Sequence, residues 1–161
     1  MASLCANMAT NDFIFCAPGD LTDEDLQMVL VETKPADPAK GWVPVYIFDM
    51  VLTGTATRVG SISFRVGETD FLVRYAGHIG YDVKPEYRGH RFAVRACRLL
   101  MPLAKKHGLK TLWLTVTPDN VASRRTCEIL GATMVEIVDL PPDCDMYAAG
   151  ERKKCRYRLD L

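Results

Sequence analysis

The sequence lacks the features that mark membrane and secreted proteins. No apolar stretch reaches the roughly 18 residues that a membrane-spanning helix needs. Met1–Asp12 holds no basic segment followed by an unbroken apolar one, so it does not resemble a signal peptide. We therefore expect no contact with a membrane.

Net charge is also lacking, because 20 basic side chains are matched by 20 acidic ones. A neutral chain exerts no overall attraction on nucleic acid. The basic segment Arg152–Arg158 is a local exception with two interpretations, a nucleic-acid-binding strand or an edge strand whose charges prevent edge-to-edge pairing. Since little aromatic interleaving accompanies these charges, we favour the edge strand and expect no nucleic-acid partner.

The cysteines show no C-x-x-C spacing, which argues against a zinc site and against a thiol redox pair. They are Cys5, Cys16, Cys97, Cys127, Cys144 and Cys155. Cys97 and Cys127 fall among apolar residues of expected helices, where a free cysteine behaves as a small hydrophobic residue. We therefore expect no metal and a reducing, cytoplasmic location.

Length and composition fit one globular domain. The chain has 161 residues, of which 48% are hydrophobic and 25% charged. No repeat and no long linker divides it, so we expect a single domain over residues 1–161, with residues 1–11 flexible.

Hydrophobic periodicity and turn signals predict alternating strands and helices. We expect strands at 26–33, 43–52, 58–66, 74–84, 110–117, 132–140 and 152–161, and helices at 89–107 and 118–130. Strand–helix–strand crossovers bring strands near-parallel, whereas the third strand returns through an antiparallel hairpin. The sequence thus predicts an α/β (α+β) fold with a central mixed sheet of six to seven strands and helices packed against it.

The joint between the fourth strand and the first helix has two interpretations, an anion site or an ordinary glycine-containing turn that binds no ligand. Pro85 ends the strand because it has no N–H to donate, and Gly89 allows a tight turn. Free N–H groups at the start of a helix attract anions such as phosphate, together with the helix dipole. Arg88 and Arg91 add positive charge at the same point.

Two motifs in this region resemble those of one enzyme family. Residues 83–93 (VKPEYRGHRFA) resemble the acetyl-CoA loop of the GNAT superfamily of N-acyltransferases, written R/Q-x-x-G-x-G/A. Residues 120–131 (NVASRRTCEILG) resemble the second motif of that superfamily, N-x-x-A/S…L-G-F. Residues 76–81 (AGHIGY) look most like the branch that acetylates ribosomal-protein N-termini and small amines.

The resemblance implies a GNAT-like enzyme that uses acetyl-CoA as cosubstrate. It would transfer the acetyl group to a primary amine of a small molecule or a protein N-terminus, by direct attack in a ternary complex. The implied cofactor-binding residues are Tyr81, Val83, Arg88, Gly89, His90, Arg91, Phe92, Ala93, Asn120 and Ser123. Arg95 and Arg98 extend a basic stripe from Arg91 that would suit the 3′-phosphate of the cofactor.

The chain departs from the family pattern at three places. Arg91 stands at the central glycine of the loop motif, where it would either crowd the pyrophosphate or clamp it. Cys127 stands where much of the superfamily has a tyrosine general acid, and we interpret it as a core residue. The segment 33–42 is too short for the two helices that form part of the acceptor wall in the family.

Attack on a thioester needs an amine without its extra proton, hence a base. His78 and Asp82 are the candidates, because both lie on one face of the expected strand 74–84. A packed core histidine is the alternative for His78. Asn120, in the first turn of its helix, is a further catalytic candidate that would bond the cofactor or an ordered water, and local helix capping is its equal alternative.

A second hypothesis is a non-catalytic acetyl-CoA-binding sensor or subunit, because the chain has no clear general acid. Steady-state transfer to an amine would separate the two hypotheses. The sequence leaves open the identity of the amine acceptor, the range of acyl groups and the oligomeric state. A homodimer is compatible with the sequence.

Overall fold

The computed structural model describes residues 13–161, which divide into two compact units. The first unit contains the described residues up to 67, residues 79–110 and Leu161. The second contains residues 68–78 and 111–160. Neither unit is continuous in sequence. The predicted flexibility of residues 1–11 lies outside the described residues.

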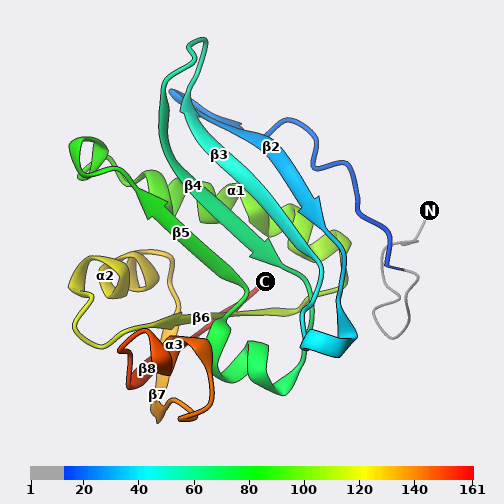
Figure 1. Ribbon diagram of the computed structural model, residues 1–161. Helices are drawn as coiled ribbons and strands as arrows, with labels where there is room; N and C mark the ends of the chain where they lie inside the picture. The colour runs from blue at the N-terminus through cyan, green and yellow to red at the C-terminus, as the bar shows by residue number, and fades with distance from the viewer. Residues whose placement is uncertain (1–12) are drawn as a thin grey trace. The chain divides into compact units, whose positions relative to one another are not determined.

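The first unit is built on a five-stranded antiparallel sheet with the order β1-β2-β3-β4-β5 (Figure 1). Its strands are β1 (Thr22–Asp23), β2 (Leu26–Lys34), β3 (Val45–Leu52), β4 (Arg58–Arg65) and β5 (Ile79–Val83). Buried and less buried residues alternate along β3 and β4, as expected for strands with one face on the core. The fully buried side chains of this face are Tyr46, Phe48, Met50, Ile62 and Phe64.

Helix α1 (Phe92–Lys106) packs against this sheet (Figure 1). Its buried side chains recur three or four positions apart, at Phe92, Ala96, Leu100 and Leu103, which gives the helix one apolar face. The helix continues through Pro102 to its last residue.

The second unit holds a three-stranded sheet with the order β6-β8-β7. Its elements are η2 (Leu72–Ala76), β6 (Thr111–Val116), α2 (Val121–Ile129), β7 (Thr133–Asp139), α3 (Asp145–Ala148) and β8 (Lys153–Asp160). β6 and β7 both pair antiparallel with β8, so they run in the same direction as the crossover predicts. They are not neighbours, because the last strand of the chain lies between them.

The α/β (α+β) class is confirmed, and the arrangement of the strands differs from the predicted central mixed sheet. The described strands form two sheets, and all their pairings are antiparallel. Local patterns locate strands along the chain, but the insertion of β8 between β6 and β7 is a long-range pairing that they do not specify.

The predicted strand 74–84 is shorter, because β5 begins at Ile79 and Leu72–Ala76 form the π-helix η2. Distant side chains hold the backbone of η2. The Nη2 of Arg156 donates to the carbonyl of Val73 at 3.0 Å. These partners lie 83 residues apart, which is why local sequence predicts a strand here.

Within residues 13–161, no helix is long and apolar enough to cross a membrane. No group of three or more His, Cys, Asp and Glu side chains in that range is arranged to hold a metal ion. Cys97, Cys127, Cys144 and Cys155 are free and buried, whereas Cys16 is disulfide-bonded. The burial of Cys97 and Cys127 agrees with their predicted packing role.

Candidate functional site

The loop between β5 and α1, residues 84–91, is here called the cradle loop. It begins with a single 3₁₀ turn, η3 (Pro85–Tyr87). Gly89 follows with φ of 92°, a conformation that favours glycine. A Cβ built on Gly89 meets no heavy atom within 4 Å. The predicted tight turn is therefore present, and its backbone faces open space at Gly89.

Arg91 occupies a conformation that glycine adopts more easily. It has φ of 58° and ψ of 28°, and it is the N-cap residue of α1. Its carbonyl accepts a hydrogen bond from the N–H of Arg95 at 3.0 Å, which closes the first turn. The three N–H groups of residues 92–94 have no partner within the helix, and no described side chain caps them. They form the type of site that binds phosphate.

We expect Arg91→Gly to increase the free energy of unfolding by about 0.5–1 kcal/mol. The change removes the steric cost of a left-handed residue, about 1–2 kcal/mol, and part of the gain is lost to the greater freedom of glycine in the unfolded chain. Urea unfolding measures the effect. An equal or lower free energy of unfolding would show that Arg91 makes compensating contacts.

The side chains of the cradle loop and of the first helical turn divide into two groups. Arg88, His90 and Arg91 are exposed, and the two arginines place positive charge at this end of the loop. Phe92 and Ala93 are buried. An anion at this place would therefore meet side chains from the loop and only backbone N–H groups from Phe92 and Ala93.

The outer edge of β5 continues this site within the first unit. β5 is the last strand of its sheet. The N–H of Lys84 donates to the carbonyl of Val59 at 2.8 Å, toward β4. Because backbone direction alternates along a strand, the backbone groups of Val83 and Tyr81 turn to the opposite edge. The carbonyl of Val83 accepts a hydrogen bond from Nε of Arg88 at 3.3 Å. The first unit thus brings together Tyr81, Val83 and residues 88–93.

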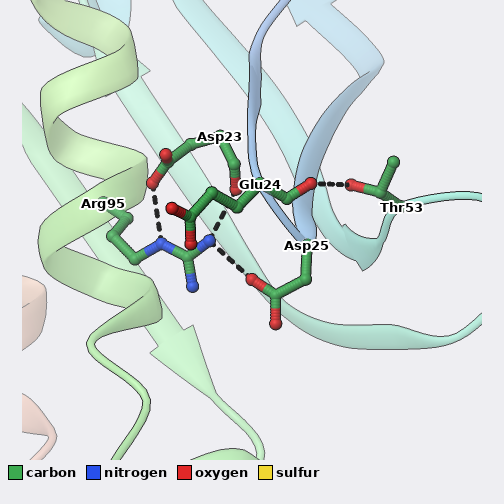
Figure 2. Close-up of polar contacts among 5 residues, drawn as sticks. All are labelled: Asp23, Glu24, Asp25, Thr53 and Arg95. Carbon is green, nitrogen blue, oxygen red and sulfur yellow. Dashed lines mark hydrogen bonds and ion pairs between the residues drawn. The ribbon is translucent and has the colours of Figure 1, made fainter.

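Arg95 does not serve the predicted basic stripe, because its guanidinium is bound elsewhere (Figure 2). Its Nε donates to Oδ2 of Asp23 at 2.7 Å, and its Nη2 donates to Oδ1 of Asp25 at 2.6 Å. These carboxylates balance its charge. The prediction that Arg95 meets a phosphate of the cofactor is therefore wrong.

Asn120 and Ser123 belong to the second unit, not to the unit that holds the cradle loop. Oδ1 of Asn120 accepts a hydrogen bond from the N–H of Ser123 at 3.2 Å, so Asn120 is the N-cap of α2. This contact favours the capping interpretation of Asn120. Thr117, which directly precedes the predicted helix 118–130, donates its hydroxyl to Oε1 of Glu151 at 3.0 Å and does not cap the helix.

His78 is buried in the second unit, with 1% of its surface exposed. Its Nδ1 accepts a hydrogen bond from the backbone N–H of Trp113 at 2.9 Å, and the backbone N–H of His78 donates to the carbonyl of Trp113 at 2.8 Å. Because Nδ1 accepts a hydrogen bond, it carries no proton and the imidazole ring is neutral. The ring thus has a structural contact. These contacts favour the packed interpretation of His78.

Asp82 is exposed and lies on β5, in the first unit. Its strand partner is Ser61, which is in turn opposite Asp49 on β3. This row alternates with the buried row that contains Phe48 and Ile62, so Asp82 lies on the sheet face away from the core. The predicted common face of His78 and Asp82 is wrong, because β5 begins after His78.

Cys127 is 2% exposed, and this burial raises the pKa of its thiol from 9.0 to about 12. A thiol of that pKa is a poor proton donor. We expect Cys127 to resist alkylation by iodoacetamide in the folded protein and to react on unfolding, as followed by mass spectrometry. Because the folded state holds this proton more tightly, its contribution to stability falls as pH rises from 9.0 toward 12. Rapid alkylation of Cys127 in the native protein would contradict its assignment as a buried core residue.

The basic strand near the C-terminus is β8, the central strand of its sheet, so the edge-strand interpretation is wrong. Its basic side chains pair with nearby carboxylates. The pairs are Lys153–Asp139, Lys154–Glu151, Arg156–Glu136 and Arg158–Asp160. Lys154 and Arg156 are also buried. This pairing leaves little charge to attract nucleic acid.

Residues 1–133 match a family model described as "Acetyltransferase (GNAT) domain". No curated protein matches the chain. Among solved structures, the chain is similar to the ribosomal-protein-S5-alanine acetyltransferase from Vibrio fischeri, with 19% identity, a TM-score of 0.57, and coverage of 72% of this chain and 61% of that one. The family resemblance of the two sequence motifs is thereby confirmed.

Two further solved structures share the fold. One, from Salmonella typhimurium, is an acetyl transferase that modifies the N-terminal serine of ribosomal protein L7/L12, with 14% identity, a TM-score of 0.57, and coverage of 76% of this chain and 66% of that one. Another is the microcin C7 self-immunity acetyltransferase MccE in complex with acetyl-CoA and AMP, with 16% identity, a TM-score of 0.55, and coverage of 73% and 61%. The chain thus spans about two thirds or less of the length of these structures.

Proposed function

Because the chain belongs to the GNAT acetyltransferase family, we propose that it transfers the acetyl group of acetyl-CoA to a primary amine. The observation that carries this proposal is the cradle loop, where an uncapped helix N-terminus follows a left-handed glycine that faces open space. This geometry fits a pyrophosphate, and Arg88 and Arg91 add charge for it. The pantetheine of the cofactor would then lie along the outer edge of β5, near Tyr81 and Val83.

In the proposed reaction, the free amine attacks the thioester carbonyl. A C–N bond forms, the C–S bond breaks, and the sulfur leaves with the coenzyme. Asp82 is the proposed base that removes the proton of the amine, directly or through water, because its carboxylate is exposed on the strand that would hold the thioester. Holding the two reactants in register supplies a large part of the acceleration. His78, Cys127 and Asn120 are left with structural roles.

The acceptor that we propose is a protein N-terminus or a small amine. The similar structure from Vibrio fischeri is a ribosomal-protein-S5-alanine acetyltransferase, and the one from Salmonella typhimurium modifies the N-terminal serine of ribosomal protein L7/L12. The test is a transfer assay with peptides that begin with serine or alanine, together with small primary amines. We expect release of coenzyme A with a peptide that gains one acetyl group, and no reaction with the same peptide already acetylated at its N-terminus.

A non-catalytic acetyl-CoA-binding role is the second candidate. The specific observation that favours it is the buried Cys127, which leaves no tyrosine acid at the position where the family has one. Calorimetry with acetyl-CoA distinguishes the candidates when combined with the transfer assay. Binding of acetyl-CoA without transfer to any amine supports the second candidate. If the protein neither binds acetyl-CoA nor transfers an acetyl group, both candidate functions are contradicted.

A further inference from the structure

Arg95 ties the first turn of α1 to the turn between β1 and β2, residues 23–25, here called the acidic turn (Figure 2). Its Nε donates to Oδ2 of Asp23 at 2.7 Å, and its Nη2 donates both to the carbonyl of Asp23 at 2.5 Å and to Oδ1 of Asp25 at 2.6 Å. The Arg95 side chain is only 17% exposed. Three hydrogen bonds from one planar group fix both the position and the orientation of the helix turn.

The acidic turn is itself held by other parts of the first unit. Glu24 has φ of 51°, and its carbonyl accepts a hydrogen bond from the hydroxyl of Thr53 at 3.1 Å (Figure 2). The N–H of Thr53 donates to the carbonyl of Asp25 at 2.8 Å. Leu26, which follows directly, is fully buried. The contacts from Thr53 therefore anchor the acidic turn to the sheet independently of Arg95.

The anchored residue is directly connected to the cradle loop. The N–H of Arg95 donates to the carbonyl of Arg91, the N-cap residue, at 3.0 Å. The N–H groups that would hold a phosphate lie between these two residues. The hydrogen bond from Arg95 is the main cause that lowers the pKa of Asp25. The Arg95 side chain therefore joins the acidic turn to the first turn of α1, which directly follows the cradle loop.

We propose that Arg95 is a positioning residue, and that with the acidic turn it holds the cradle loop in place to bind acetyl-CoA. This inference rests on the proposed function. The acidic turn carries three carboxylates and Arg95 one positive charge, so electrostatics alone disfavours an anion nearby. Removing one carboxylate should strengthen the binding of acetyl-CoA through its charge, but should weaken that binding if the carboxylate positions Arg95. The two effects on the affinity are opposite, which makes the inference testable.

The experiment compares Asp25→Asn with Glu24→Gln. Both remove one negative charge from the acidic turn, but only Asp25 is an acceptor of the Arg95 guanidinium. We expect Asp25→Asn to raise the Kd for acetyl-CoA about fivefold to tenfold, because a neutral amide binds the Arg95 guanidinium less strongly than a carboxylate and the N–H groups are then held less firmly. Glu24→Gln leaves the Kd unchanged or slightly lowers it. Calorimetric titration measures both.

S-acetylpantetheine, which lacks the pyrophosphate, separates positioning from a general loss of structure. We expect its Kd, measured by NMR titration, to be the same for the wild type and Asp25→Asn. Arg95→Lys is a second variant, since an ammonium keeps the charge but not the planar geometry, and the same pattern is expected. Equal weakening of both ligands would overturn the inference, as would unchanged or tighter acetyl-CoA binding by Asp25→Asn.

The wild-type titration distinguishes failure of this inference from failure of the proposed function. If the wild type does not bind acetyl-CoA, the proposed function fails and the positioning role fails with it. If the wild type binds acetyl-CoA and both Asp25→Asn and Arg95→Lys bind it as tightly as the wild type, only the positioning role is overturned.

Discussion

Gly89→Trp is expected to abolish the binding of acetyl-CoA while the protein still folds. A side chain at this position would project into the open space that the cradle loop faces, because a built Cβ meets no atom within 4 Å. At about 100 times its Kd, a ligand stabilises the native state by about 2.7 kcal/mol. For a chain of this size, that raises the melting temperature of the wild type by about 5–10 °C. The variant should show no increase.

Gly108→Trp is the matched control for this experiment. Gly108 has φ of 79°, and a Cβ there also meets no atom within 4 Å. Because of this positive φ, a tryptophan at Gly108 has a similar backbone cost, about 1–3 kcal/mol. Gly108 lies beyond the other end of α1, so the substitution does not touch the cradle loop. We expect its melting temperature to rise with acetyl-CoA as the wild type does. A normal rise for Gly89→Trp would contradict the proposed cofactor site.

The cradle loop is the part of the site that the sequence predicts best, because its determinants are local. Pro85 ends a strand through its own missing N–H, and Gly89 supplies its own left-handed conformation. Neither depends on distant partners. The left-handed Arg91 shows that this backbone persists where the family motif has glycine. The conformation of the loop is therefore specified by more than its glycines.

Sequence patterns do not predict the contacts of residues whose partners lie far away in the chain. Arg95 looks like part of a basic stripe, but its carboxylate partners lie about 70 positions earlier. His78 falls within the predicted strand as a candidate base, but its Nδ1 accepts the N–H of Trp113, 35 positions later. Helical and strand periodicity report which residues face the core, and they carry no information on which distant groups meet there.

The roles of Thr117 and Asn120 illustrate competition between equally good local signals. Thr117 followed by proline is a strong start signal for a helix. Asn120 is an equally good cap three positions later, and it is the one that α2 uses. The hydroxyl of Thr117 is taken by Glu151, 34 positions away. The helix thus begins three positions later than the signal at Thr117 indicates, and the hydroxyl of Thr117 is used in a tertiary contact.

Asp82→Asn is expected to lower kcat by about 100-fold to 10,000-fold, the usual contribution of a general base. The amide keeps the size of the side chain and cannot take the proton of the amine. The Kd for acetyl-CoA should stay unchanged, because Asp82 directs its backbone toward β4 and not toward the proposed cofactor edge. Steady-state kinetics with the best amine measures each effect.

Asp49→Asn supplies the matched control, because Asp49 lies in the same cross-strand row, with Ser61 between it and Asp82. Its carboxylate is already bound by Nε of Arg58 at 2.8 Å. Both variants remove one negative charge from the same face of the sheet, so an effect of charge on the approach of a cationic amine would appear in both as a higher KM. A large fall in kcat for Asp82→Asn alone identifies the base. Equal values of kcat for the two variants would mean that the amine loses its proton to water or to another group.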